Sequence, residues 1–288
     1  MKPYNENQQL KSKIPEEKKY ENLTLKSDFM FCRIMKQNPE LCREIAEILI
    51  EEPVGELEFI ESHFEVKESA DGKGVVFDVI AKDSNTCYNI EMQVAKEKAL
   101  GKRVRYYRGI TDATLLEAGQ SYNELFKAFV IFICAYDPFK TGLVKYTFRQ
   151  TCEQVPQANL GDDAAVIIIN LASTQLADTN ERFRNLVSYL AGHEPQDNLG
   201  KKLDKAVQEA RKNTDWRSDY MNYMEHIKVE RAEAYEEGDT NRLKTDICSL
   251  HEAGFDIEMI MRGLKVSREL VEETLGLQSS GETLSSSV

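Results

Sequence analysis

Two runs of the chain are nearly all apolar, and they constrain the fold more than any other feature. They are AFVIFICAY at residues 128–136 and AAVIIINLA at residues 164–172. A strand that is apolar throughout is covered on both of its faces, whereas a strand with one solvated face alternates. The two runs therefore predict strands of a sheet that lies between layers of helices. LVKYTFRQ at residues 143–150 predicts a further strand.

A short polar turn, DSNT, joins two other predicted strands, GVVFDVIAKD at residues 74–83 and TCYNIEMQVA at residues 86–95. Asp, Ser and Asn favour tight turns, so the pair predicts a β-hairpin. If the loop is centred between Ser84 and Asn85, the numbers of opposed residues add to 169. Asp78 then lies directly across from Glu91, with Cβ atoms roughly 4.5–5.5 Å apart.

Two carboxylates in this position repel each other, and a buried charge is costly unless something pairs with it. A divalent cation between Asp78 and Glu91 removes both penalties, and Mg²⁺ and Mn²⁺ prefer oxygen ligands. Gln93 shares the face of Glu91 because side chains alternate along a strand. The alternative is an ordinary hairpin with both acids on a solvated face. The strongly apolar neighbours of the two acids favour the metal site.

A basic segment follows the hairpin directly. KEKALGKRVRYYR at residues 96–108 carries six Lys or Arg residues and one Glu, within a predicted helix from about residue 96 to 121. Residues four apart share a helix face, so we expect Arg103 to pair with Tyr107. Guanidinium groups here would bind DNA phosphates, and the alternative is that the tyrosines pack on the sheet. The DNA-contacting candidates are Arg103, Arg105, Tyr107 and Arg108.

The overall composition excludes several classes of protein. A formal net charge of −12 is unlike a passive, basic nucleic-acid coat, although local clusters can still attract DNA. The six cysteines form no C-x-x-C pair and the four histidines no H-x-x-x-H pair, so we expect reduced thiols and no histidine-based metal site. The chain has neither a membrane-length apolar run nor a signal peptide, so we expect a cytoplasmic protein that does not bind membranes.

The chain divides into five expected segments that differ in polarity and in predicted secondary structure. Residues 1–22 and 277–288 are polar and predicted to be disordered. Residues 23–178 form the α/β domain, residues 179–238 a helical extension, and residues 239–276 a small helix-turn-helix-like tail of three helices with turns at Gly254 and near 263–267. The second helix of that tail, RELVEETL, is acidic, unlike a helix that reads DNA. We therefore expect oligomerisation or domain docking from the tail, and a homo-oligomer.

Several of these motifs occur together in a known family. Asp78, Glu91-Met92-Gln93, KRVRYYRGITDATLLEAG and FVIFICAYDPF resemble the PD-(D/E)xK nuclease superfamily, in its branch of nuclease-family transposases and recombination-promoting nucleases. The opening helix LKSDFMFCRIM is similar to that branch as well. The resemblance covers roughly residues 23–220. It implies an α/β, restriction-endonuclease-like fold at residues 23–178, with a mixed central sheet flanked by helices, followed by an all-helical C-terminal region.

The resemblance also implies a function, that of a Mg²⁺-dependent (or Mn²⁺-dependent) DNA endonuclease associated with transposition or recombination. It implies metal binding by Asp78, Glu91 and the main-chain carbonyl of Met92, with Gln93 at the position where the family usually has Lys. Glutamine can position a water molecule but supplies no charge, so a catalytically inactive DNA-binding or protein-interaction module is the alternative. The first helix of that branch implies that Asp28 is a supporting acid, and the alternative is a plain helix cap.

Overall fold

The computed structural model describes residues 19–60 and 77–277, without the side chains of residues 230–237. The chain divides into two compact units, the first ending at Arg217 and the second beginning at Ser218. The two predicted disordered segments lie outside the described residues, apart from residues 19–22 and 277. Residues 61–76 also lie outside them, and β1 is described over Glu58–Phe59. The predicted domain boundaries stay predictions.

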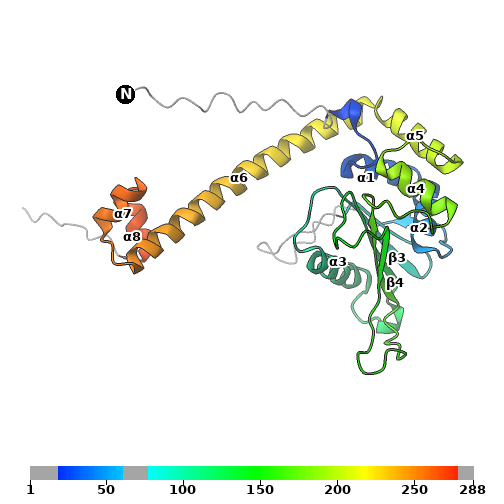
Figure 1. The fold of residues 1–288 in the computed structure, drawn as a ribbon, viewed down its shortest axis with the longest axis horizontal. Coiled ribbons are helices and arrows are strands. Elements are labelled where there is room, and N and C mark those ends of the chain that lie inside the picture. Colours follow the sequence, from blue (N-terminus) through cyan, green and yellow to red (C-terminus); the bar gives the residue numbers. More distant parts are fainter. Residues whose placement is uncertain (1–18, 61–76, 278–288) are drawn as a thin grey trace, which may run out of the picture. The chain divides into compact units, whose positions relative to one another are not determined.

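The first unit is built around a mixed six-stranded sheet, and the mixed sheet that the family resemblance implied is thereby confirmed (Figure 1). Its strand order is β1-β2-β3-β4-β6-β5, with β3, β4 and β6 parallel and the other pairings antiparallel. The strands are β1 (Glu58–Phe59), β2 (Val79–Lys82), β3 (Thr86–Gln93), β4 (Lys127–Cys134), β5 (Lys145–Phe148) and β6 (Ala164–Asn170). The two apolar runs form β4 and β6 at the parallel centre, where both faces are buried.

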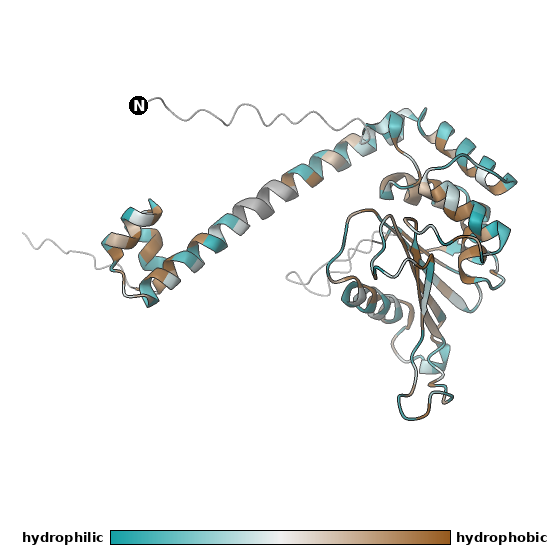
Figure 2. Cartoon of the chain, viewed as in Figure 1, coloured by the Kyte–Doolittle hydropathy of each residue, from teal (hydrophilic) through white to brown (hydrophobic). Residues whose placement is uncertain are grey.

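Helices cover this sheet on both sides (Figure 1). Figure 2 shows that hydrophobic residues are concentrated in the strands. The helices of this unit are α1 (Asp28–Gln37), α2 (Pro39–Ile50), α3 (Leu100–Leu115), α4 (Glu181–Ala191) and α5 (Asn198–Ala210), with short 3₁₀ turns η2 (Tyr20–Asn22) and η3 (Tyr122–Glu124). Asn38-Pro39 separates the first two helices: α1 ends at Gln37 and Pro39 opens α2.

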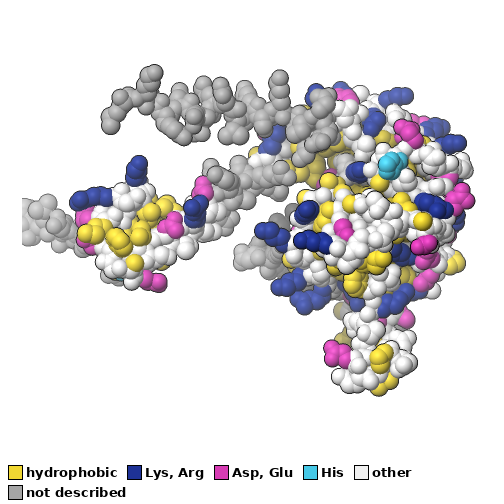
Figure 3. Space-filling view, viewed as in Figure 1, with side chains coloured by type: hydrophobic (Ala, Val, Ile, Leu, Met, Phe, Trp, Pro, Cys, Tyr) yellow, Lys and Arg dark blue, Asp and Glu magenta, His cyan; other side chains and the backbone are white. Residues whose placement is uncertain are grey.

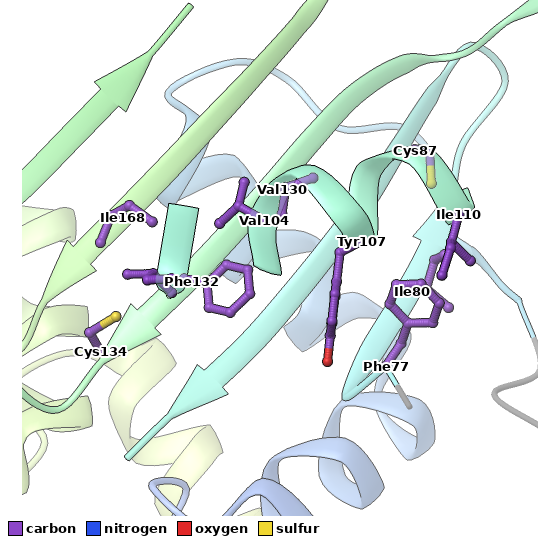
Figure 4. Packing of buried hydrophobic residues seen from close by; sticks show 11 residues of the cluster. Phe77, Ile80, Cys87, Val104, Tyr107, Ile110, Val130, Phe132, Cys134 and Ile168 are labelled. Carbon is purple, nitrogen blue, oxygen red and sulfur yellow. The ribbon is translucent and has the colours of Figure 1, made fainter. Parts of the chain in front are cut away.

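Helix α3 packs on the sheet through one apolar stripe, shown in Figure 4. Val104, Tyr107 and Ile110 of this stripe are buried against Val130 and Phe132 of β4. The helix is shorter than the expected 96–121, because a turn at residues 98–99 precedes it and Gly119, at a φ of +93°, lies in the turn that follows it. This packing sets α3 beside the end of β3, where the predicted carboxylates lie.

The second unit contains most of α6 (Thr214–Glu252) together with α7 (Ile257–Leu264) and α8 (Arg268–Leu275). A small core of Ile247, Ile260 and Val271 joins the three helices. The expectation that a new helix begins after Gly238 is wrong, because α6 continues through this glycine to Glu252. A single interior glycine costs a helix only about 1 kcal/mol and does not have to end it. The predicted turns after Glu252 and before Arg268 are present.

All six cysteines lie in the described part of the chain and are free thiols, as predicted. Cys42, Cys87 and Cys134 are buried, and burial raises the pKa of each of these three thiols to about 12. They are therefore protonated packing residues at neutral pH. Among residues 19–60 and 77–277, no helix is both long and apolar enough to span a bilayer.

Candidate functional site

The hairpin has the register that the turn predicted. Val79 pairs with Ile90 and Ile80 with Asn89, which places Asp78 beside Glu91 just before β2 begins. Two hydrogen bonds join the acids' residues: the Asp78 N–H donates to Glu91 Oε1 at 3.2 Å, and the Met92 N–H donates to Asp78 Oδ2 at 2.7 Å. Each carboxylate therefore accepts from the other strand, and both are held at one point of the sheet.

Burial makes the charged forms of both acids costly. Glu91 is only 1% exposed, and burial, followed by the nearby Asp78 carboxylate, raises the pKa of Glu91 well above its usual value. Burial also raises the pKa of Asp78 to about 7, and the charge of Asp28 contributes in the same direction. The Met92 hydrogen bond, Arg103 and Lys36 act in the opposite direction on Asp78. The two acids therefore form a strained pair that favours a bound cation or a proton.

Arg103 reaches from α3 to this pair. Its guanidinium lies 3.4 Å from Glu91 Oε2 and donates to Gln93 Oε1 at 2.6 Å and to the Tyr107 hydroxyl at 2.8 Å. The predicted pairing of Arg103 with Tyr107 is thus present, one helical turn apart. The guanidinium also lies over the ring of Tyr107, 4.9 Å from its centroid, and over that of Phe132, at 5.5 Å. The sequence indicated the helical pair but not the contacts with the strand.

Gln93 ends β3 and is buried beside Glu91. Its Nε2 donates to the carbonyl of Ala95 at 2.5 Å, and its Oε1 accepts from Arg103. Because a guanidinium only donates and a carbonyl only accepts, these two partners define which end of the amide is oxygen. The amide oxygen is therefore the end that lies toward Arg103.

Asp28 is the first residue of α1, and its Oδ1 accepts from the N–H of Phe29 at 2.7 Å. Ser27, the N-cap residue of α1, makes no side-chain hydrogen bond that caps the helix. Within the described residues, no group of three or more His, Cys, Asp or Glu side chains is close enough to hold a metal ion. The site consists of two carboxylates, and the role of Asp28 as a supporting acid stays a prediction.

The other predicted DNA contacts lie in different surroundings on α3. Tyr107 is buried, with its ring edge-on to Phe77 at 5.1 Å between centroids, and burial raises the pKa of Tyr107 to about 12. Figure 4 shows Tyr107 pointing from α3 toward the sheet. Arg108 pairs with Asp162 at 3.0 Å. Arg105 is exposed, as is Lys102, which the sequence analysis did not single out. Figure 3 shows Lys and Arg side chains gathered over α3.

Asn89 is a further polar residue on the same strand face as Glu91, and it was not among the predicted site residues. It is 1% exposed, and neither its Oδ1 nor its Nδ2 has a hydrogen-bond partner in the described part of the chain. Leaving a buried amide unpaired costs about 1–3 kcal/mol. Asn89 is therefore a local source of instability within the strand that carries the site.

Replacing Asn89 with leucine removes this cost with little change in volume. We expect Asn89→Leu to raise the free energy of unfolding by about 1–2 kcal/mol in urea titrations. Asn170→Leu is the matched control, because Asn170 is also fully buried but bonds to the carbonyl of Leu143 and the N–H of Ala172. That control should destabilise the protein. Equal destabilisation by both variants contradicts the expectation.

Comparison with known proteins gives one match. The model of the family described as PD-(D/E)XK nuclease family transposase matches residues 25–249. The matched range includes the hairpin and α3 and extends through most of α6. No curated protein and no solved structure matched the chain.

Proposed function

Because the chain belongs to the PD-(D/E)XK nuclease family transposases, we propose that it is a Mg²⁺-dependent DNA endonuclease acting in transposition or recombination. The observation that carries this proposal is the pairing of Asp78 and Glu91 across one hairpin. Membership of the family implies DNA as the partner. A homo-oligomer and a cytoplasmic location remain predictions.

The residues present fit a hard divalent cation. Each carboxylate accepts a hydrogen bond from the main chain of the other strand. Burial and the nearby Asp78 carboxylate make the ionised form of Glu91 costly, and a bound cation offsets that cost. Mg²⁺ commonly takes one or two protein carboxylates and fills its other positions with water and substrate phosphate oxygens. Asp78, Glu91 and the carbonyl of Met92 would hold the ion. When bound, it supplies an activated water and stabilises the charge that grows on the scissile phosphate.

The chain's own residues determine how water and the DNA strand are arranged at this point. Gln93 offers an amide oxygen with one lone pair left over beside its bond to Arg103, so it can accept a hydrogen bond from the attacking water. Lys102 and Arg105, exposed on α3, supply charge for backbone phosphates, and neither forms an ion pair with a described acid. Helix α3 thus links the proposed cleavage site to the proposed DNA surface.

Calorimetry with Mn²⁺ tests the proposal against an inactive DNA-binding or interaction module. We expect the wild-type protein to bind Mn²⁺ at neutral pH, and Asp78→Asn to weaken this binding by at least tenfold, because one of two carboxylate ligands is lost. Asp163→Asn, which removes an exposed acid elsewhere, should bind as the wild type does. The neutral Gln93 is the observation that favours the alternative, an inactive module. Absence of Mn²⁺ binding to the wild-type protein would support that alternative.

A further inference from the structure

We propose that Arg103 is a positioning residue for the Glu91 and Gln93 side chains, and that it does not contact DNA phosphate. This inference rests on the proposed function for its catalytic part. Its structural part depends only on contacts within the protein. Three groups accept from the guanidinium or pair with it: Glu91, Gln93 and Tyr107. All three lie on the sheet side of α3, at the site itself.

The guanidinium of Arg103 directs N–H donors toward the protein interior. One terminal nitrogen donates to Gln93, and the other lies between Glu91 and the Tyr107 hydroxyl. The rings of Tyr107 and Phe132 lie against it, which restricts its rotation. Its side chain is 30% exposed, so some of the group reaches solvent. Three of its five N–H donors are directed at Glu91, Gln93 and Tyr107, so a phosphate could use only the two that remain.

The position of the Gln93 amide depends on two partners, Ala95 and Arg103. Ala95 holds the amide nitrogen, and Arg103 is the partner that holds the amide oxygen beside Glu91. Without a donor at this position, the Gln93 amide can rotate. Glu91 also loses the guanidinium charge of Arg103, which lies 3.4 Å from its Oε2. Misplacement of a reacting or water-orienting group by about 1 Å lowers turnover by about 10²-fold. Loss of Arg103 should therefore affect turnover rather than DNA affinity.

Arg105 provides a comparison within the same helix. It is exposed, two residues from Arg103, and has no acidic partner in the described residues. Each phosphate contact adds about 0.9 to the slope of log K against log salt concentration for duplex DNA. Replacing Arg105 with methionine should reduce that slope by about one. Replacing Arg103 in the same way should leave it unchanged.

The experiment measures binding and cleavage by the full chain for Arg103→Met, Arg103→Lys and Arg105→Met. Binding of a labelled 30-base-pair duplex is titrated in EDTA over a range of NaCl concentrations, and cleavage is measured in Mg²⁺. We expect Arg103→Met to lower kcat by about 10²-fold with KM within about twofold, and Arg103→Lys to recover little, because lysine lacks the planar fork. Arg182→Met, on α4, is the control for loss of a surface charge.

Two outcomes overturn the inference. The first is a fall in the salt slope of about one for Arg103→Met, with recovery by Arg103→Lys, which marks a phosphate contact. The second comes from thermal unfolding in EDTA. Arg103→Met should lower the unfolding midpoint of the wild-type protein, and the same substitution in a Gln93→Leu background should lower it by half as much or less. Equal shifts in the two backgrounds would show that the two side chains are not coupled. If the wild type does not cleave DNA, the proposed function fails, while the salt slope and the unfolding shifts still decide the role of Arg103.

Discussion

Glu91→Ala should abolish metal-dependent nicking of supercoiled plasmid DNA. Glu91 is one of the two buried carboxylates that the hairpin places together, and no third acid joins them in the described residues. A metal ion contributes several kcal/mol to stabilisation of the transition state, so losing a ligand lowers the rate by about 10³-fold or more. The measurement is the rate of conversion of supercoiled to open-circular plasmid in Mg²⁺ or Mn²⁺.

Two further variants make this result interpretable. Glu91→Gln keeps the shape of the side chain, and it should be as inactive as Glu91→Ala and fully folded, because burial already disfavours the charge of Glu91. Glu153→Ala removes an exposed acid of the same type and should leave nicking unchanged. Nicking by Glu91→Gln at more than a tenth of the wild-type rate would contradict the proposed role.

The metal-free protein should lose stability as the pH rises from about 4 to about 7. Burial raises the pKa of Asp78 to about 7 in the folded protein, whereas an unfolded Asp titrates near 3.9. Between these values the folded state keeps the proton that the unfolded state has lost, so this group's contribution is complete below about pH 4. It is lost as the pH rises through 7. Each pKa unit is about 1.4 kcal/mol, which gives about 2–4 kcal/mol.

Comparison with Asp78→Asn isolates this contribution from all other titrating groups. Asparagine resembles the protonated acid, so the variant and the wild type should be similarly stable at pH 4, and the variant should be more stable at pH 8. The measurement is urea unfolding of both proteins in EDTA across this range. A difference in free energy of unfolding that stays constant with pH would show that Asp78 titrates normally.

The sequence was sufficient to predict the sheet and its hairpin. The apolar runs of β4 and β6 are buried on both faces, and a short turn with Asp83 and Asn85 determines the register that brings Asp78 to Glu91. These features are local: the hydrogen bonds that join the two acids' residues span 13 and 14 residues. Local pattern and turn chemistry are enough to predict contacts of this kind.

The contacts that the sequence did not predict depend on how a helix packs against the strands. Arg103 and Tyr107 were expected to share a helix face, but which face is buried depends on Phe77, just before β2, and on Phe132 of β4. Arg103, Tyr107 and Arg108 were grouped with Arg105 as DNA contacts because all four lie in one basic helical segment. In the fold, one lies at the site, one is buried and one pairs with Asp162. A one-dimensional pattern does not contain these distances.

The local character of the hairpin has a consequence for the order in which parts of the protein fold. The parallel pairings that surround the hairpin, β3 with β4 and β4 with β6, join residues roughly 40 positions apart, and such long-range pairings form slowly. A hairpin with a short turn closes in about 1–10 μs. Asp78 and Glu91 should therefore come together before the parallel strands have paired. The two carboxylates that we propose as cation ligands would then be adjacent before the rest of the sheet has formed.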